Sequence, residues 1–346
     1  TGNTLTNSFY HGIDIGNWAG TVSDMNISNN TFTSSTVSAS ANGSAIRVGE
    51  HGSVSTVANV TKAELNNNTI TNFPGGAGIL FQTGNLTSGG PSGTYGSAGT
   101  PITITGNSMK GASASNLMGT QAINVSVADP SPGSGGGGAG VFDIENNGSA
   151  LSPLADTAGV TIACSAFGNV TVVCTISNNV IDQNSNVNGQ PGIAVGGDGN
   201  GDTSKIATLT STISNNSIKN TQGNGILATN KAASGLMKFK IQNNTVAAPL
   251  GGVRPGIRIE SGNGTAGENT SVCLNISGNT SAGSGGTQGI GLRKQGTVPT
   301  TDAFAINGMT ATSSPDVENY VNGLNPAGGG TLLISATSGF TNCSLP

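Results

Sequence analysis

Apolar and polar residues alternate along this chain in short segments that run into a corner rich in Asn. The segment Cys174–Ile181 reads Cys-Thr-Ile-Ser-Asn-Asn-Val-Ile. Related segments are Ile27–Phe32, Leu65–Ile70, Ile104–Met109, Ile144–Ser149, Ile213–Ile218, Ile241–Val246 and Ile276–Ser281. Alternation with a period of two predicts β-strands, and Asn tolerates the left-handed backbone conformation of a sharp bend. Each segment is therefore predicted to form a strand, an Asn corner and a second strand.

A second element lies between the Asn corners: a small residue, an apolar residue, any residue and usually another apolar residue. Its copies begin at Gly12, Ala45, Gly78, Ala122, Gly159, Gly192, Gly225, Gly256 and Gly289, so the first apolar positions follow one another after 33, 33, 44, 37, 33, 33, 31 and 33 residues. Helical repeats of this period would have apolar stripes spaced three and four residues apart. A β-propeller would need four strands per blade and a longer repeat. Alternation by two, interrupted by Gly, instead predicts a parallel β-helix of about nine coils.

Strings such as Thr212–Ile218 followed by Gly223–Ile226 resemble the right-handed parallel β-helix repeats of pectate-lyase-like proteins and phage tailspikes. They are most similar to the repeats of bacterial secreted or surface adhesins and autotransporter passengers. The resemblance covers roughly residues 1–310 and implies an all-β, right-handed parallel β-helix. It implies no single activity, because this fold hosts unrelated functions.

The repeat predicts what each position does in such a fold. The Ile and Val residues of both elements are expected to point inward and stack from coil to coil. Asn residues at successive corners are expected to form an Asn ladder, each side-chain amide bonding to the next. The expected ladder residues are Asn30, Asn68, Asn107, Asn147, Asn179, Asn216, Asn244 and Asn279.

The C-terminal segment departs from the repeat. The pattern fades after Met309, so residues 1–310 are predicted to form the β-helix and residues 311–346 a C-terminal cap. Ser314–Val321 has a capping Ser and an early Pro, and Gly323 follows as a stop, which predicts a short helix. Its apolar side, formed by Val317, Tyr320, Val321 and Leu324, is expected to cover the last coil.

The composition and net charge of the chain limit the classes of partner that it can bind. Charged residues make up 8% of the chain, against roughly 25% in a typical soluble domain. The net charge is −4 with 12 Lys and Arg residues, so no nucleic-acid partner is expected. No apolar run approaches the roughly 20 residues of a membrane span.

The four cysteines suggest two disulfides, Cys164 with Cys174 and Cys273 with Cys343. Four cysteines allow three connectivities, and buried free thiols are the alternative. Disulfides together with few charges suit an extracellular or periplasmic setting, and the expected location is extracellular or at the cell surface.

One segment resembles a metal-binding loop. Asp198, Asn200 and Asp202 place oxygen-bearing side chains at every second position with Gly between them, as in the first half of a calcium loop. The closing Glu is absent, because Leu209 occupies its position. The segment is either a structural calcium site or an acidic turn, and no other cofactor is expected.

Residues 33 positions apart should be neighbours on adjacent coils. Trp18 and His51 are such a pair, and two stacked rings either form a sugar-binding platform or face solvent without a ligand. The same spacing predicts cross-strand ion pairs between Asp14 and Arg47 and between Glu260 and Arg293.

No catalytic residue is predicted. Asp143 and Glu145 should point outward roughly 7 Å apart on one strand, but the other acids are scattered. The polygalacturonase pattern of paired Asp, Gly-His-Gly and Arg-Ile-Lys is missing. Loop insertions at 84–100, 128–140 and 196–205 should leave the rod at one corner, where a site could lie.

The resemblance to bacterial surface passengers implies a non-catalytic secreted or cell-surface rod or adhesin, with a surface polysaccharide or its own copies as partners. The alternatives are a polysaccharide lyase or hydrolase, a tailspike-like depolymerase, and a subunit of an extracellular filament.

Overall fold

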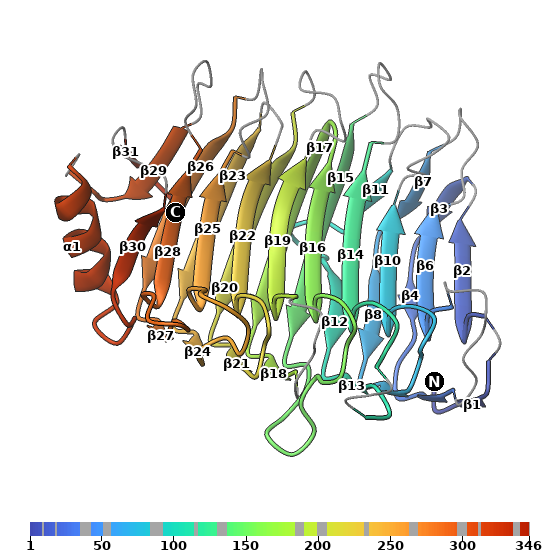
Figure 1. The fold of residues 1–346 in the computed structure, drawn as a ribbon. Coiled ribbons are helices and arrows are strands. Elements are labelled where there is room, and N and C mark those ends of the chain that lie inside the picture. Colours follow the sequence, from blue (N-terminus) through green and yellow to red (C-terminus); the bar gives the residue numbers. More distant parts are fainter. Residues whose placement is uncertain are drawn as a thin grey trace.

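Parallel strands of successive coils are hydrogen-bonded along the whole molecule, which forms a parallel β-solenoid with one helix at its C-terminal end (Figure 1). The computed structural model describes residues 1–8, 10–17, 19–34, 43–50, 57–83, 93–113, 117–129, 137–183, 190–198, 206–231, 235–262, 269–295, 303–310, 313–334 and 340–345. The fold class predicted from the repeat is thus confirmed.

One face of the solenoid is a ten-stranded parallel sheet. Its strands, in spatial order, are β2 (Ile13–Asn17), β6 (Ile46–Glu50), β10 (Ile79–Thr83), β14 (Ile123–Ala128), β16 (Ile162–Phe167), β19 (Ile193–Asp198), β22 (Ile226–Lys231), β25 (Ile257–Ser261), β28 (Ile290–Lys294) and β30 (Thr331–Ile334).

The second face is a thirteen-stranded sheet. Its main path comprises β3 (Gly20–Val22), β7 (Ala58–Val60), β11 (Thr94–Tyr95), β15 (Gly138–Glu145), β17 (Val170–Ser177), β20 (Thr208–Ser214), β23 (Leu236–Gln242), β26 (Ser271–Ser277), β29 (Ala303–Asn307) and β31 (Phe340–Cys343). β4 (Met25–Asn26), β8 (Ala63–Asn66) and β12 (Ile102–Thr105) lie beside this path.

The third face is split into two four-stranded sheets. The first contains β1 (Thr4–Thr6), β5 (Thr31–Thr33), β9 (Thr69–Thr71) and β13 (Ser108–Lys110), and the second β18 (Val180–Asp182), β21 (Ser217–Lys219), β24 (Thr245–Val246) and β27 (Thr280–Ser281). Single-residue bridges at Leu154 and Ala155 lie between them.

The coil count differs slightly from the nine predicted, because the ten-stranded sheet takes one strand from each of ten successive coils. The apolar element marks a strand of the ten-stranded sheet, but it does not require a strand on every face. Within the described ranges, the coil of β16 has only single-residue bridges on the third face, and α1 (Ser314–Leu324) occupies that place in the last coil.

The structure also corrects one alignment of the repeat. Ile162, and not Val160, pairs with Ile123 and Ile193, so the steps there are 39 and 31 residues instead of 37 and 33. The residues before Ile162 form a wider corner, which is held by a buried hydrogen bond from the Gln183 side chain to Thr161.

The core is a stack of inward side chains in constant register. Nine isoleucines lie in one column of the ten-stranded sheet, from Ile13 through Ile46, Ile79, Ile123, Ile162, Ile193, Ile226 and Ile257 to Ile290. From Ile46 onward these side chains are fully buried. Each fully buried Ile contributes about 1.5–3 kcal/mol, so the stack supplies much of the stability of the rod.

The two residues of each Asn corner have different roles. The first takes a left-handed backbone, with φ of 56° at both Asn146 and Asn178. At Gly106 and Gly278 a glycine with positive φ takes the same place. The second residue is the buried Asn of the ladder.

The ladder is continuous along the solenoid. The side chain of Asn147 donates to Oδ1 of Asn179 at 3.0 Å, and that of Asn179 donates to Oδ1 of Asn216 at 3.0 Å. The same bond joins all eight predicted residues in turn. It continues to Asn3 at one end and to Asn325 at the other, which are not among the eight expected ladder residues.

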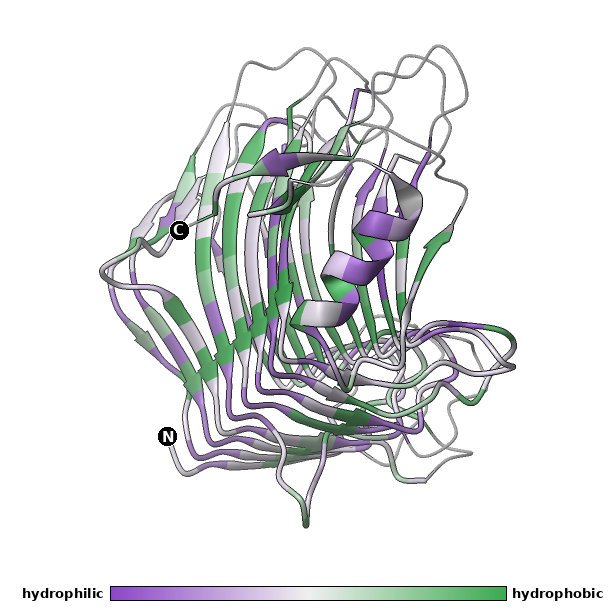
Figure 2. Ribbon diagram, turned by 90° about the vertical axis from the view of Figure 1, so that its left-hand side faces the viewer, coloured by the Kyte–Doolittle hydropathy of each residue, from purple (hydrophilic) through white to green (hydrophobic). Residues whose placement is uncertain are grey.

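The helix α1 lies across the C-terminal end of the solenoid (Figure 2). Val317 and Val321 are fully buried against the last coils, as predicted for the apolar side. The predicted bounds are wrong by one or two residues, because Ser313 is the N-cap and the helix runs past Gly323 to Leu324. β30 and β31 follow α1 and extend both long sheets, so solenoid strands continue beyond residue 310.

Both disulfides expected from the sequence are present. Cys164–Cys174 joins β16 to β17 inside the core, with a Cα–Cα distance of 6.8 Å. Cys273–Cys343 joins β26 to β31, with a Cα–Cα distance of 6.0 Å. Among the residues that the structure describes, no helix is long and apolar enough to cross a membrane.

Candidate functional site

The outer face of the ten-stranded sheet carries three hollows at successive positions along the solenoid. The N-terminal groove spans β2 to β14, the middle hollow spans β16 to β22, and the C-terminal hollow spans β22 to β28. Most of their lining side chains point away from the core. We refer to these three hollows together as the outer trough, which is the candidate binding site.

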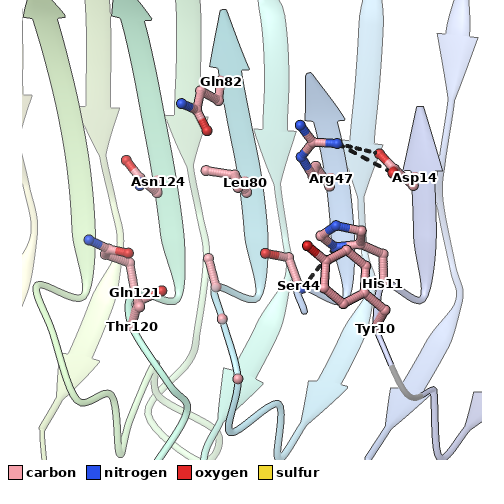
Figure 3. Close-up of a pocket in the computed structure, with 13 residues that line it drawn as sticks. Tyr10, His11, Asp14, Ser44, Arg47, Leu80, Gln82, Thr120, Gln121 and Asn124 are labelled. Atoms are coloured by element: carbon pink, nitrogen blue, oxygen red, sulfur yellow. Dashed lines mark hydrogen bonds and ion pairs between the residues drawn. The ribbon is translucent and has the colours of Figure 1, made fainter. Parts of the chain in front are cut away.

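The N-terminal groove is the largest hollow, with a volume of about 560 Å³ (Figure 3). Its floor is one outward column in which Asp14, Arg47, Leu80 and Asn124 are paired in register on neighbouring strands. Arg47 Nη1 lies 3.0 Å from Asp14 Oδ1, which confirms the predicted ion pair. The carboxylate of the groove is therefore neutralised by its neighbour.

One wall of the groove is aromatic. The rings of Tyr10 and His11 meet edge to face with centroids 4.3 Å apart, and Tyr10 is 48% exposed. Nδ1 of His11 accepts a hydrogen bond of 3.0 Å from the backbone N–H of Ser44 on the next coil. Because Nδ1 accepts this bond, the proton of the neutral ring is on Nε2. The same bond fixes the orientation of the His11 ring relative to the next coil.

The opposite side of the groove carries amide side chains from β10, β14 and the corner before β14. Gln82, Gln121 and Asn124 are half-buried, and their amides have no hydrogen-bond partner among the described residues. Figure 3 shows them on the side of the groove away from Tyr10 and His11. Amides that can both donate and accept, opposite an exposed ring, suit the hydroxyl groups and apolar faces of sugars.

The middle hollow has a floor of small residues and a volume of about 260 Å³. Ser165, Gly196 and Thr229 are paired in register across its floor. A Cβ atom at Gly196 would lie 2.6 Å from Oγ1 of Thr229, so a larger residue cannot fit without a shift. Asp198 and Lys231 lie opposite each other at its edge.

The C-terminal hollow is rich in arginine and has a volume of about 230 Å³. Arg254 precedes β25, Arg258 lies on β25 and Arg293 lies on β28. The side chain of Glu260 is 8% exposed and contacts both Arg258 and Arg293, the latter at 3.4 Å. The contact with Arg293 confirms the second predicted ion pair.

The ring pair and the calcium loop are mostly outside the part of the chain that the structure describes. Trp18 and His51 both lie outside it, although the preceding residues Asn17 and Glu50 pair in register. Asn200 and Asp202 also lie outside it, while Asp198 ends β19 and lines the middle hollow. Within the described ranges, no group of three metal-ligating side chains is found.

The carboxylates on the thirteen-stranded sheet are separated from the trough. Asp143 and Glu145 flank the buried Ile144 on β15, and Ser177 donates to Glu145 at 2.8 Å. Near the N-terminal end, a hydrogen bond to Glu64 and the charge of Asp24 raise the pKa of Lys62. The Ser177–Glu145 and Lys62–Asp24 contacts each link two neighbouring coils, so these charged side chains have a structural role in the stack.

Sequence reasoning missed the trough although its signal was present. The residue between the two apolar positions of the second element is the outward column, which contains Arg47, Leu80 and Asn124. That position looked unconstrained because its chemistry changes from coil to coil. The predicted insertions at 84–100, 128–140 and 196–205 lie largely outside the described residues, although Gly196 and Asp198 at the start of the last one line the middle hollow.

Comparison of the chain with protein-family models, curated proteins and solved structures found no match.

Proposed function

We propose that this protein is a non-catalytic extracellular or cell-surface rod that binds an extended glycan along its outer trough. The observation that carries the proposal is the succession of three hollows along one face of the solenoid. A polymer is the ligand class that can occupy several hollows at once, and each occupied hollow adds to the affinity.

The lining of the trough supports a glycan as that polymer. The N-terminal groove offers free amides at Gln82, Gln121 and Asn124, and an exposed ring at Tyr10. The floor of the middle hollow offers hydroxyl groups at Ser165 and Thr229. Hydroxyl-rich sugars are bound through such polar groups and rings, whereas an apolar ligand would leave the amides unpaired.

The charge pattern in the N-terminal groove supports binding over hydrolysis. Glycosidases use two carboxylic groups that flank the bond to be broken, one of which acts as an acid. In the groove, Asp14 is held in an ion pair with Arg47. The extracellular part of the proposal rests on the two disulfides, which persist in oxidising compartments.

Binding is tested by titrating the protein with neutral and acidic oligosaccharides of increasing length in a calorimeter. We expect affinity to rise with length until the oligosaccharide spans the trough. The double variant Gln121→Ala/Asn124→Ala removes two hydrogen-bonding amides and should weaken binding about tenfold or more. Thr175→Ala, an outward change on the thirteen-stranded sheet, should leave binding unchanged.

Two results would contradict the proposal. Equal weakening by Thr175→Ala would show that the ligand does not lie in the trough. New reducing ends or unsaturated products during the titration would show that the protein is an enzyme.

A further inference from the structure

We infer that the C-terminal hollow is an oxyanion site, which makes the ligand of the trough an acidic glycan bound in one direction. This inference rests on the proposed function and adds the chemistry of the sugar. The site comprises Arg254, Arg258, Arg293 and Glu260, with Asn224 and Leu227 on the side of β22. It takes a carboxylate or a sulfate ester carried by the polymer.

The first argument is the balance of charge. Glu260 is a single carboxylate between the guanidinium groups of Arg258 and Arg293. The guanidinium group of Arg254 makes no hydrogen bond or ion pair with any described residue, and the side chain is half-buried. Three positive charges therefore meet one negative charge. This local excess contrasts with a chain whose net charge is −4.

The second argument is that the arginines are held in place but not fully satisfied. The buried Glu260 fixes two guanidinium groups on adjacent strands, so little side-chain entropy remains to be lost on binding. Nε of Arg258 and Nε of Arg293 are both buried without a hydrogen-bond partner. The two arginine side chains are nevertheless 24% and 26% exposed, so part of each remains open to a ligand in the hollow.

The third argument is the match between arginine and oxyanions. A guanidinium group presents a planar fork of N–H donors that binds carboxylates and related oxyanions through two parallel hydrogen bonds. Arg254 comes from the corner before β25, while Arg258 and Arg293 come from the floor. The donors therefore face the hollow from two sides, which suits a group that enters from solvent.

The fourth argument is the contrast with the rest of the trough. In the N-terminal groove Arg47 is paired with Asp14, and in the middle hollow Lys231 lies opposite Asp198. The excess of positive charge is thus confined to one end of the trough. A polymer with an acidic group at a defined position would be bound in one orientation and register.

The test compares three oligosaccharides of equal length: neutral, uronic-acid-containing and sulfated. Calorimetry at low salt should show that at least one acidic form binds about tenfold more tightly than the neutral form. The uronic-acid and sulfated arms identify which oxyanion is recognised. The preference should shrink as salt is raised, because the contacted charges are partly exposed.

Arg254→Gln removes the unpaired guanidinium group and leaves the contacts of Glu260 intact. We expect this variant to lose about tenfold in affinity for the acidic ligand and nothing for the neutral one. Lys219→Gln is the matched control, because Lys219 is an exposed cation paired with Asp182 on the third face. It should change neither affinity.

The outcomes separate the two proposals. Equal affinity for neutral and acidic ligands, or an acidic preference that Arg254→Gln leaves unchanged, would overturn the oxyanion site while the glycan-binding trough stands. Failure of every oligosaccharide to bind would overturn both.

Discussion

The two residues of an Asn corner differ in what they require. Asn178 is exposed and needs a backbone with positive φ, a conformation that glycine also adopts readily. Asn179 is fully buried, and its side chain donates to the backbone oxygen of Ile144 and accepts two N–H groups from Asn147. The first residue therefore serves the local bend, and the second joins three successive coils.

This difference predicts opposite sensitivity at adjacent positions. Asn179→Ala leaves buried polar groups of Asn147 and Ile144 unpaired, so we expect the free energy of unfolding to fall by about 3 kcal/mol. Asn178→Gly should change it by less than about 0.5 kcal/mol, because glycine accepts the same φ. Chemical denaturation of both variants measures these changes. Equal losses would show that the ladder bonds add little to stability.

The helix α1 replaces a third-face strand in the last coil. Val317 and Val321 face the core, and the Tyr320 hydroxyl donates to the backbone oxygen of Asn307 at 2.9 Å. Asn325 follows the helix and accepts from the Asn279 side chain at 2.9 Å. The helix thus covers the apolar end of the stack while the chain rejoins the ladder.

We predict that α1 stabilises the end of the solenoid through its buried apolar face. Val321→Ala removes two methyl groups from a filled site and should lower the free energy of unfolding by about 2 kcal/mol. Asn319→Ala changes an exposed position of the same helix and should be neutral. Thermal unfolding compares the two. A neutral Val321→Ala would mean that α1 does not stabilise the end of the solenoid.

The whole molecule is a one-dimensional stack in which each coil contacts its neighbours. Stability in such a fold is close to a sum of coil and interface terms, so one end can open without the other. Cys273–Cys343 closes a loop of 70 residues around the last coils and α1. From the loop-closure entropy, this disulfide is expected to stabilise the folded state by about 4 kcal/mol.

Cys343→Ser should therefore act locally within the long molecule. We expect hydrogen exchange to become faster in β29, β30, β31 and α1, while β6, β10 and β14 keep the protection of the parent protein. Mass spectrometry of peptides after exchange reports both regions at once. Uniform loss of protection along the chain would show that the solenoid unfolds as a single cooperative unit.

The sequence by itself determined the fold, the inward columns and the eight central residues of the ladder. Each coil repeats the same chemistry, so stacking places equal positions in contact wherever the step is constant. The constant step of 33 residues also located the ion pair of Asp14 with Arg47 and that of Glu260 with Arg293.

Only the tertiary structure decided how irregular segments rejoin the stack. Ile162 rather than Val160 enters the column because the corner before it is widened by buried polar groups, and Asn325 enters the ladder from a helix. The repeat marks the outward positions of the ten-stranded sheet, but only the structure shows which of them line the trough. Its arginines and amides come from outward positions and corners of different coils, and their approach depends on how those corners pack.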